Sequence, residues 1–306
     1  MKQKRYPSRQ KGYGGSRDLI LFLLPGMGAY AFIMLYPNIA SIWYSLTKWS
    51  GYGKPEFVGL ANFRRMALDP ALPIAMGMAA RGIFLALAVT VPLGFVLAFL
   101  LSRIARGGKT FRFFYFLPLI LPGTVLGIMW KNFFLYKGVL NYALRRVGLD
   151  VLARGWLTQI GLVQWTVLLP SVWSGVCFYI IIFAAALAGI PPELYDAAAI
   201  DGASGWQEMI HITLPSVRGV YVTTMILALP GALSTFIYPY VLTEGGPVRS
   251  TYSLALWLFN NIYAIPGASR PPAIGYGSAI ALLHGFLGIA LGLAVWRFGR
   301  SGEISG

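Results

Sequence analysis

The stretch ELYDAAAIDG (residues 193–202), which leads to ITLP (residues 212–215), lies between two long apolar segments. Four of the ten acidic residues of the protein fall in or between these two runs: Glu193, Asp196, Asp201 and Glu208. A segment this polar in an apolar chain suggests a surface that binds another protein. If so, the role of this segment would show whether the protein is a channel, an enzyme or one subunit of a motor-driven transporter.

The composition indicates a polytopic membrane protein. Of the 306 residues, 57% are hydrophobic and 11% are charged, and the mean hydropathy is +0.65, whereas soluble domains carry about 25% charged residues. The net charge of +15 comes from basic residues that flank apolar segments, which favours retention at the cytoplasmic face over nucleic-acid binding. The single cysteine, Cys177, excludes an intrachain disulfide.

Six apolar segments are long enough to cross a bilayer, since an α-helix needs about 20 apolar residues to do so. They predict an all-α membrane protein with six transmembrane helices and a membrane domain over residues 19–300. No small-residue cleavage pattern follows the first segment, so we expect an uncleaved helix there. The predicted spans lie at about 19–36, 83–101, 113–130, 161–187, 220–242 and 276–298, between a basic tail (1–18) and a short tail (301–306).

Basic residues orient the predicted spans. The first tail is rich in Lys and Arg, and four more basic residues follow the second span: Arg103, Arg106, Lys109 and Arg112. Because such residues are retained in the cytoplasm, we expect both termini to be cytoplasmic and segments 37–82, 131–160 and 243–275 to lie outside. The acid-rich stretch, within a loop over residues 188–217, is then cytoplasmic.

Local signals in this loop predict a helix, a glycine turn and a second helix. Pro191 and Pro192 fit a helix start, and Gly202 fits the left-handed residue that follows a helix. Ser204 and Gln207 have the spacing of a capping box. The second helix is expected to end near Leu214, since Pro215 disfavours helical geometry before it. These signals alone fit a docking element and a connector on the membrane surface equally well.

The motif Asp196-Ala197-Ala198-x-x-x-Gly202, followed after nine residues by Ile212-x-Leu214-Pro215, resembles the EAA loop of binding-protein-dependent ABC importer permeases. Asp196 stands where this family usually has Glu. Further features resemble the carbohydrate-importing branch: residues 57–63 (FVGLANF), Leu117-Pro118, Trp173 and residues 242–247 (LTEGGP). The last of these resembles the first permease of the heterodimeric systems for sugars and glycerol-3-phosphate.

The resemblance implies a transport subunit of the cell inner membrane and not an enzyme. It implies a second homologous permease, two ABC ATPase subunits, an external solute-binding protein and a carbohydrate substrate. ATP and Mg would be used by the partner ATPase, and this chain would bind no cofactor or metal. The residues expected to couple to the ATPase are Glu193, Asp196, Ala197, Ala198, Asp201, Gly202, Ala203, Leu214 and Pro215.

A path for sugars should offer hydroxyl groups and aromatic faces rather than charges. The fourth and fifth predicted spans supply such side chains, and Ser171, Ser174 and Phe178 share one helical face by their spacing. Helix packing through small polar residues and interfacial aromatic belts are the alternative interpretation. The substrate-path candidates are Ser171, Trp173, Ser174, Gly175, Phe178, Tyr179, Ser234, Thr235 and Tyr238.

No catalytic pattern stands out. Residues 107–110 resemble the end of a phosphate-binding loop, but Arg103 replaces a glycine that the motif requires. His211 and His284 are too far apart in sequence for a convincing metal site, and His284 fits either a pathway or a packing role in the sixth span. Arg81 is expected to snorkel from the outer end of the second span.

Three outer arginines, Arg145, Arg146 and Arg154, fit either a solvated loop or the attraction of an acidic sugar or binding protein.

Two other classes of function stay open. One is an importer for a different solute, such as glycerol-3-phosphate or a polyamine. The other is a polytopic membrane enzyme, which would need clustered acidic or histidine side chains near a membrane face.

Overall fold

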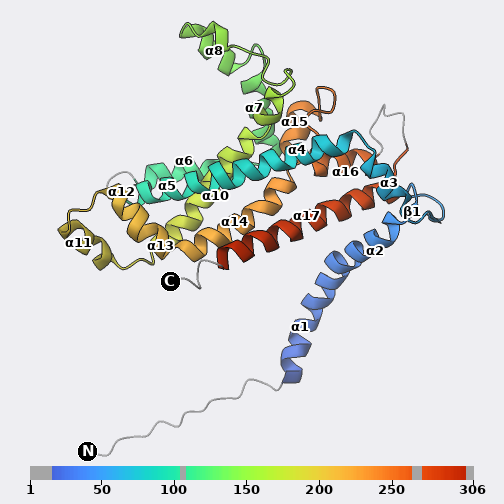
Figure 1. The fold of residues 1–306 in the computed structure, drawn as a ribbon, viewed down its shortest axis with the longest axis horizontal. Helices are drawn as coiled ribbons and strands as arrows, with labels where there is room; N and C mark the ends of the chain where they lie inside the picture. The colour runs from blue at the N-terminus through green and yellow to red at the C-terminus, as the bar shows by residue number, and fades with distance from the viewer. Residues whose placement is uncertain (1–15, 104–107, 264–270, 301–306) are drawn as a thin grey trace, which may run out of the picture.

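The computed structural model describes residues 16–103, 108–263 and 271–300, and these parts of the chain are mostly α-helical (Figure 1). The predicted tails lie outside the described residues, except for 16–18. The helices are α1 (Ser16–Tyr30), α2 (Tyr36–Ser45), α3 (Ala61–Ala67), α4 (Ala71–Phe84), α5 (Val91–Ser102), α6 (Gly108–Ile120), α7 (Gly123–Phe134), α8 (Val139–Arg146), α9 (Leu162–Thr166), α10 (Leu169–Leu187), α11 (Pro192–Ile200), α12 (Gly205–Glu208), α13 (Leu214–Ser216), α14 (Arg218–Leu233), α15 (Ile237–Thr243), α16 (Leu254–Ile262) and α17 (Ile274–Arg300).

Short irregular segments join several of these helices. Wide π-helical segments occupy Ala31–Leu35, Leu85–Thr90 and Met209–Thr213, and a 3-10 turn occupies Asp150–Leu152. A two-stranded antiparallel hairpin pairs β1 (Thr47–Lys48) with β2 (Glu56–Phe57), with Thr47 opposite Phe57.

Within the described ranges, five helical segments are long and apolar enough to cross a membrane: Ile20–Ser45, Ala71–Ser102, Leu162–Leu187, Arg218–Thr243 and Ile274–Arg297. The second begins at Ala71 rather than Ile83, because the helix continues through Arg81, whose guanidinium lies 5.6 Å from the Trp165 ring centroid. Arg81 is therefore not at the outer end of its span.

The predicted span 113–130 is divided into α6 and α7. Pro122 has an extended backbone (φ −56°, ψ 138°) and ends the helical path between Ile120 and Gly123. Proline also lacks the N–H that a continuous helix would need here. A mean hydropathy over this segment does not reveal the break, since most of the residues around it are apolar.

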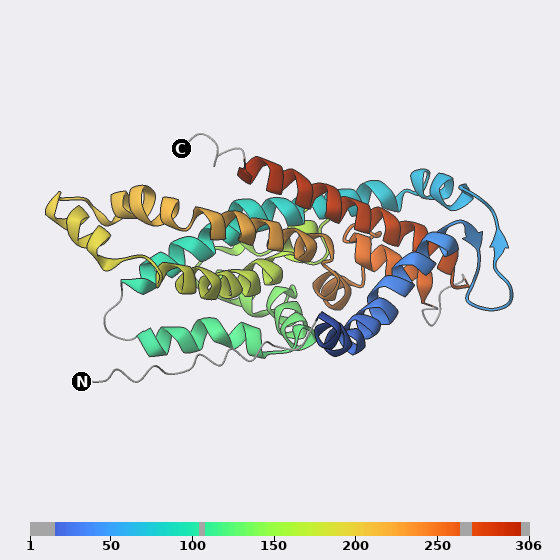
Figure 2. The ribbon, with the colours of Figure 1, turned by 90° about the horizontal axis from the view of Figure 1, so that it is seen from below.

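The long helices run side by side, and the loop carrying α11 to α13 lies at the opposite end of the bundle from the β-hairpin and α3 (Figures 1 and 2). Helix α1 leaves the bundle, and α8 projects from its side. No residue of the most apolar window in the first span is buried against the rest of the described chain.

Helices α5 and α10 form the central contact of the bundle. The rings of Phe95 and Phe183 meet edge to face with centroids 5.4 Å apart, and Tyr221 of α14 packs against both. Gly94 permits this approach, because a Cβ at that position would lie 2.7 Å from the Tyr179 Cβ. Small residues of this kind let membrane helices pack closely.

We expect Gly94→Val to destabilise the bundle, because the added side chain would collide with α10. Overpacking of this kind costs about 1–3 kcal/mol, and a lower midpoint of thermal unfolding in detergent would report it. Gly292→Val is the matched control, since a Cβ on this glycine of α17 meets nothing within 4 Å. Equal midpoints for the two variants would contradict the close α5–α10 contact.

Candidate functional site

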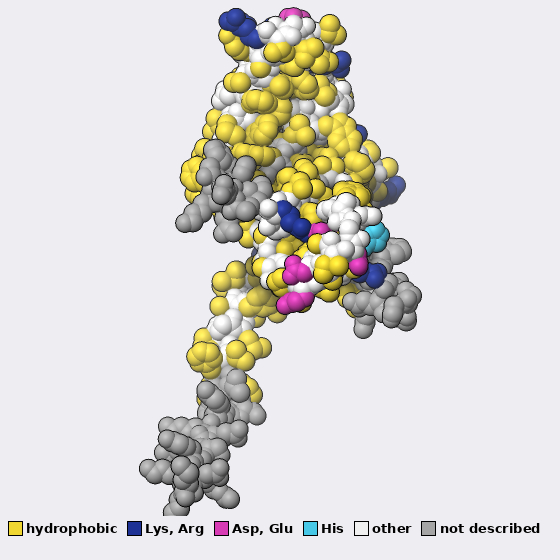
Figure 3. Space-filling view, turned by 90° about the vertical axis from the view of Figure 1, so that its left-hand side faces the viewer, with side chains coloured by type: hydrophobic (Ala, Val, Ile, Leu, Met, Phe, Trp, Pro, Cys, Tyr) yellow, Lys and Arg dark blue, Asp and Glu magenta, His cyan; other side chains and the backbone are white. Residues whose placement is uncertain are grey.

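Two regions gather the residues that the sequence singled out: the loop between α10 and α14, and a cavity between the long helices. The loop closes one end of the bundle (Figure 1). Figure 3 looks onto this end and shows acidic and histidine side chains gathered there.

The loop begins as its sequence predicts. Gly202 has φ +75°, and two hydrogen bonds complete the end of α11: Ala203 N donates to Ala198 O (2.9 Å), and Gly202 N donates to Ala199 O (3.2 Å). This is the Schellman pattern of a glycine-terminated helix. The capping box also forms, because Ser204 N donates to Gln207 Oε1 (2.7 Å) and Gln207 N donates to Ser204 Oγ (3.4 Å).

The second helix of the loop does not end at Leu214. Helix α12 passes through the wide turn Met209–Thr213 into α13, which reaches Ser216. Pro215 is the second residue of α13, where its missing N–H breaks no hydrogen bond. The loop is thus joined to α14 by nearly continuous helix rather than by a flexible link.

An ion pair ties the loop to the end of α5. Arg103 donates to Glu208, whose side chain is only 8% exposed, while that of Arg103 is 43% exposed. The Arg103 guanidinium also lies 4.8 Å from the Tyr195 ring centroid, and Tyr195 Oη is 3.0 Å from Thr213 Oγ1. Glu208 therefore holds the loop in place, whereas Glu193, Asp196 and Asp201 are exposed.

The residues predicted for coupling surround the exposed tip of the loop. Glu193, Asp196, Ala197, Asp201, Gly202 and Pro215 are exposed, Ala203 and Leu214 are half-buried, and Ala198 is buried. A hollow of about 330 Å³ is lined by Ala198, Asp201, Gly202, Ala203 and by Gln207, Glu208, His211 and Ile212 from the second helix.

Ile200 and Trp206 are the most exposed of the large apolar side chains in the loop, and the sequence reasoning did not select them. Ile200 is 87% exposed and Trp206 is 64% exposed, beside the acidic residues. Ile200 is the last residue of α11 and Trp206 is the second residue of α12, so each lies at a helix end beside the turn that joins the two helices. That position is the signal that could have identified them.

The central cavity has a volume of about 430 Å³ and is lined by uncharged residues. It contains eight of the nine substrate-path candidates, which come from α10 and from the α14–α15 junction: Ser171, Ser174, Gly175, Phe178, Tyr179, Ser234, Thr235 and Tyr238. Trp173 does not line it, because its ring packs edge to face on Trp130 with centroids 5.7 Å apart.

Hydroxyl groups around the cavity already donate hydrogen bonds within the protein. Ser174 Oγ donates to Pro170 O (3.0 Å), Thr235 Oγ1 to Ala232 O (3.1 Å) and Thr90 Oγ1 to Leu85 O (2.9 Å). Each oxygen keeps a lone pair for a ligand, since a hydroxyl has one donor and two acceptor positions. The cavity therefore offers acceptors to a ligand that carries many donors.

Irregular backbone also meets at this cavity. The π-helical segment Leu85–Thr90 contributes Leu85, Ala86 and Thr90, and the chain between α14 and α15 is non-helical at 234–236. Inside a bilayer, non-helical backbone is tolerated only where it is covered by protein or lines a cavity. The sequence reasoning missed this break, although Pro230 and Pro239 flank it.

His284 lies against the wall of the cavity. Its Nε2 is 3.1 Å from Ser234 Oγ, and Ser234 lines the cavity while His284 does not. Arg145 and Arg146 lie on α8, where each guanidinium is stacked on a tyrosine, Tyr136 and Tyr142. Among the described residues, no three His, Cys, Asp or Glu side chains are grouped as a set of metal ligands.

We expect Glu208→Ala to loosen the loop, because Arg103 loses its carboxylate partner. A hydrogen bond between charged groups of intermediate exposure contributes about 1–2 kcal/mol, so backbone amides of 204–216 should exchange hydrogen several-fold faster. Glu193→Ala is the control, since Glu193 is exposed and has no ion-pair partner within the described ranges. Equal exchange in the two variants would exclude the anchoring role.

Comparison with known proteins gives three consistent results. The family described as "Binding-protein-dependent transport system inner membrane component" matches residues 90–298. The diacetylchitobiose uptake system permease protein NgcF of Streptomyces coelicolor is 31% identical, over 87% of this chain and 78% of NgcF. The multiple sugar-binding transport system permease protein MsmF of Streptococcus mutans is also 31% identical, over 86% of this chain and 88% of MsmF.

The fold is similar to that of a chain from a bacterial alginate ABC transporter, solved in complex with an alginate pentasaccharide-bound periplasmic protein. The TM-score is 0.78 and the sequence identity is 21%, and the match covers 93% of this chain and 95% of the other. At 21% identity, this similarity shows a shared fold and nothing further.

Proposed function

Because this chain belongs to the binding-protein-dependent transport system inner membrane component family, we propose that it forms the membrane path for a carbohydrate in an ATP-driven importer. It is a transport subunit of the inner membrane. The observation that carries the substrate class is the central cavity, whose lining is uncharged and combines hydroxyl oxygens with aromatic rings. The relatives NgcF and MsmF, which are named for sugar transport, support the same class.

The proposed topology has six crossings, with α6 and α7 together forming the third. Both termini are cytoplasmic, and the loop between α10 and α14 faces the cytoplasm. The position of this loop at the opposite end of the bundle from the β-hairpin supports this arrangement (Figure 1). A broken crossing is acceptable where protein covers it; Leu121 and Gly123 are half-buried, and Gly123 is near Ile237.

The loop is proposed to dock on a separate ABC ATPase. An exposed tip that combines carboxylates with Ile200 and Trp206 suits a socket with basic and apolar residues. Glu193, Asp196, Ala197, Ala198, Asp201, Gly202, Ala203, Leu214 and Pro215 would form or shape this contact. ATP and Mg would be used by the ATPase, and this chain would hold neither.

A second permease is proposed to complete the path. The central cavity is open in this chain, and the most apolar window of the first span has no buried residue, so both surfaces are available to a homologous subunit. An external solute-binding protein would deliver the carbohydrate. The uncharged cavity counts against glycerol-3-phosphate or a polyamine as the substrate, since a charged solute would need a charged partner there.

We expect Asp196→Ala and Gly202→Asp to uncouple ATP hydrolysis from uptake while the protein still reaches the membrane. The first removes an exposed charge of the tip, and the second strains a residue at φ +75°. Uptake in vesicles should fall about ten-fold or more, the size expected for loss of a charge pair at an interface. Asp150→Ala, an exposed outer acid, is the control; unchanged uptake in both loop variants would end the docking proposal.

We expect Gly231→Phe to block uptake without disturbing assembly. Gly231 lines the central cavity, and a Cβ there meets nothing within 4 Å, so the ring would enter open space. Gly219→Phe is the matched control on the same helix, since it has equal room and lies outside the cavity. Carbohydrate uptake and co-purification with the partner subunits are the two measurements; full uptake in Gly231→Phe would exclude this cavity as the path.

A further inference from the structure

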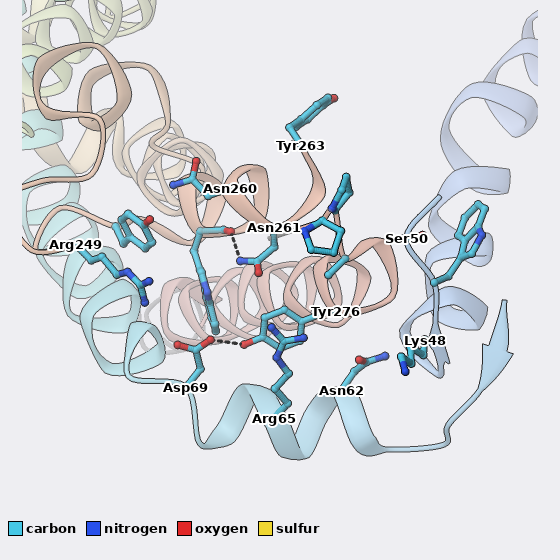
Figure 4. Close-up of a pocket in the computed structure, with 16 residues that line it drawn as sticks. Lys48, Ser50, Asn62, Arg65, Asp69, Arg249, Asn260, Asn261, Tyr263 and Tyr276 are labelled. Carbon is cyan, nitrogen blue, oxygen red and sulfur yellow. Dashed lines mark hydrogen bonds between the residues drawn. The ribbon is translucent and has the colours of Figure 1, made fainter. Parts of the chain in front are cut away.

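A second, larger pocket lies at the end of the bundle that carries the β-hairpin (Figure 4). This outer pocket has a volume of about 550 Å³ and lies between the end of β1, α3, α16 and the start of α17. Its floor is formed by buried residues, and three cationic side chains, Lys48, Arg65 and Arg249, stand exposed at its edge. In the proposed topology it opens to the outside.

The cations of the outer pocket have no carboxylate partner. No ion pair involving Lys48, Arg65 or Arg249 occurs in the part of the chain that the structure describes. Asp69 also lines the pocket, but its Oδ2 accepts from Tyr276 Oη (2.7 Å) and its Oδ1 accepts from Ala71 N (2.9 Å). Three cations against one carboxylate leave a surplus of positive charge.

Arg65 is held in a defined orientation. Its guanidinium lies 4.1 Å from the Tyr276 ring centroid, and Tyr276 is in turn fixed by its hydrogen bond to Asp69 (Figure 4). A guanidinium stacked on an aromatic face keeps the N–H groups in its plane available. Arg65 is thus prepared to bind a carboxylate through two parallel hydrogen bonds.

The rest of the lining suits a sugar ring. Asn261 Nδ2 donates to Trp257 O (2.8 Å), which leaves Oδ1 as an acceptor, and Asn260 stands beside it. Trp49 and Tyr252 add half-buried aromatic rings. A concave site of several hundred Å³ encloses a small molecule, whereas a single carboxylate side chain from a protein would fill little of it.

The outer pocket is separate from the central cavity. The two share no lining residue. Beneath the outer pocket lies an apolar cluster that extends from Trp257 and Tyr276 to Leu233, the residue before Ser234 of the cavity wall. A ligand in the outer pocket therefore does not occupy the central cavity.

We propose that the outer pocket binds a carboxylate-bearing saccharide, with Arg65 and Arg249 recognising the carboxylate. The saccharide part of this inference rests on the proposed carbohydrate transport, whereas the anion part rests on the pocket alone. The site would let the importer distinguish acidic from neutral sugars at its outer face, although its central cavity has no charge to do so.

The test uses the complete importer complex in lipid nanodiscs without ATP. The probes are the trisaccharide of cellouronic acid and neutral cellotriose, a pair that differs in its carboxylates. The acidic trimer should bind about ten-fold or more tightly than cellotriose, because a paired Arg–carboxylate contact forms with only one of them. Arg65→Gln with Arg249→Gln should abolish this preference, and Arg64→Gln, an exposed neighbour outside the pocket, should preserve it.

A second variant separates the two cavities. The preference for the acidic trimer should survive in Gly231→Phe, which fills the central cavity; its loss there would assign the binding to that cavity and overturn the proposal. Equal binding of the two trimers, or a preference that survives in the double arginine variant, would also overturn it. The proposal would also be overturned if the acidic trimer did not bind and the double variant no longer captured the binding protein. The pocket would then be a docking site for that protein.

Failure of the carbohydrate function gives a different result. If the importer carries no carbohydrate, uptake of labelled cellotriose and of the acidic trimer is absent in every variant, including Arg64→Gln. The binding preference at the outer pocket is measured without transport, so it is decided independently.

Discussion

Backbone hydrogen bonding in lipid is the constraint on which this structure depends. An N–H or C=O group without a partner in the bilayer costs several kcal/mol, so the chain crosses as helix wherever lipid surrounds it. Segments that depart from the regular α-helix are informative, because an unpaired backbone group in lipid costs free energy. The π-helical segment Leu85–Thr90 and the non-helical residues 234–236 both lie at the central cavity. These two departures bring irregular backbone and hydroxyl groups to the cavity, whereas the π-helical segment Ala31–Leu35 and the break at 121–122 lie outside its lining.

The same bundle is rigidly connected to its polar end. Arg103 follows α5, Glu208 lies in the loop, and Tyr195 stacks on the guanidinium from the first helix of that loop. Helix α5 packs on α10 through Gly94, and α10 contributes several residues of the cavity wall. A displacement of the loop thus has a short, well-packed route to the cavity through α5 and α10. A second route runs through α13 into α14, which contributes Ala228, Gly231 and Ala232 to the wall.

The sequence predicted features that depend on neighbouring residues and missed those that depend on distant ones. The glycine turn at Gly202 and the capping box of Ser204 and Gln207 are specified within a few residues, so their pattern could be recognised directly. The pairing of Arg103 with Glu208 and the hydrogen bond from Tyr276 to Asp69 join residues more than 100 positions apart. No local pattern contains them. The outer pocket was missed for this reason, since its residues come from four separate segments.

The break at Pro122 was missed because apolar residues on both sides give the same hydropathy as an unbroken helix. Eight of the nine substrate-path candidates line one cavity, because two short segments carry most of them. Trp173 packs on Trp130 instead, and only the tertiary structure orients that ring.

The hydroxyl groups of the central cavity have a consequence for any solute that enters it. Ser174, Thr235 and Thr90 have already given their protons to the backbone, so each can only receive a hydrogen bond. A polyhydroxylated solute would find these three groups as acceptors, without any ionic contact from the uncharged lining. Each such hydrogen bond adds little net free energy, because the solute gives up comparable bonds to water. These three groups would therefore hold a hydroxyl-rich solute only weakly.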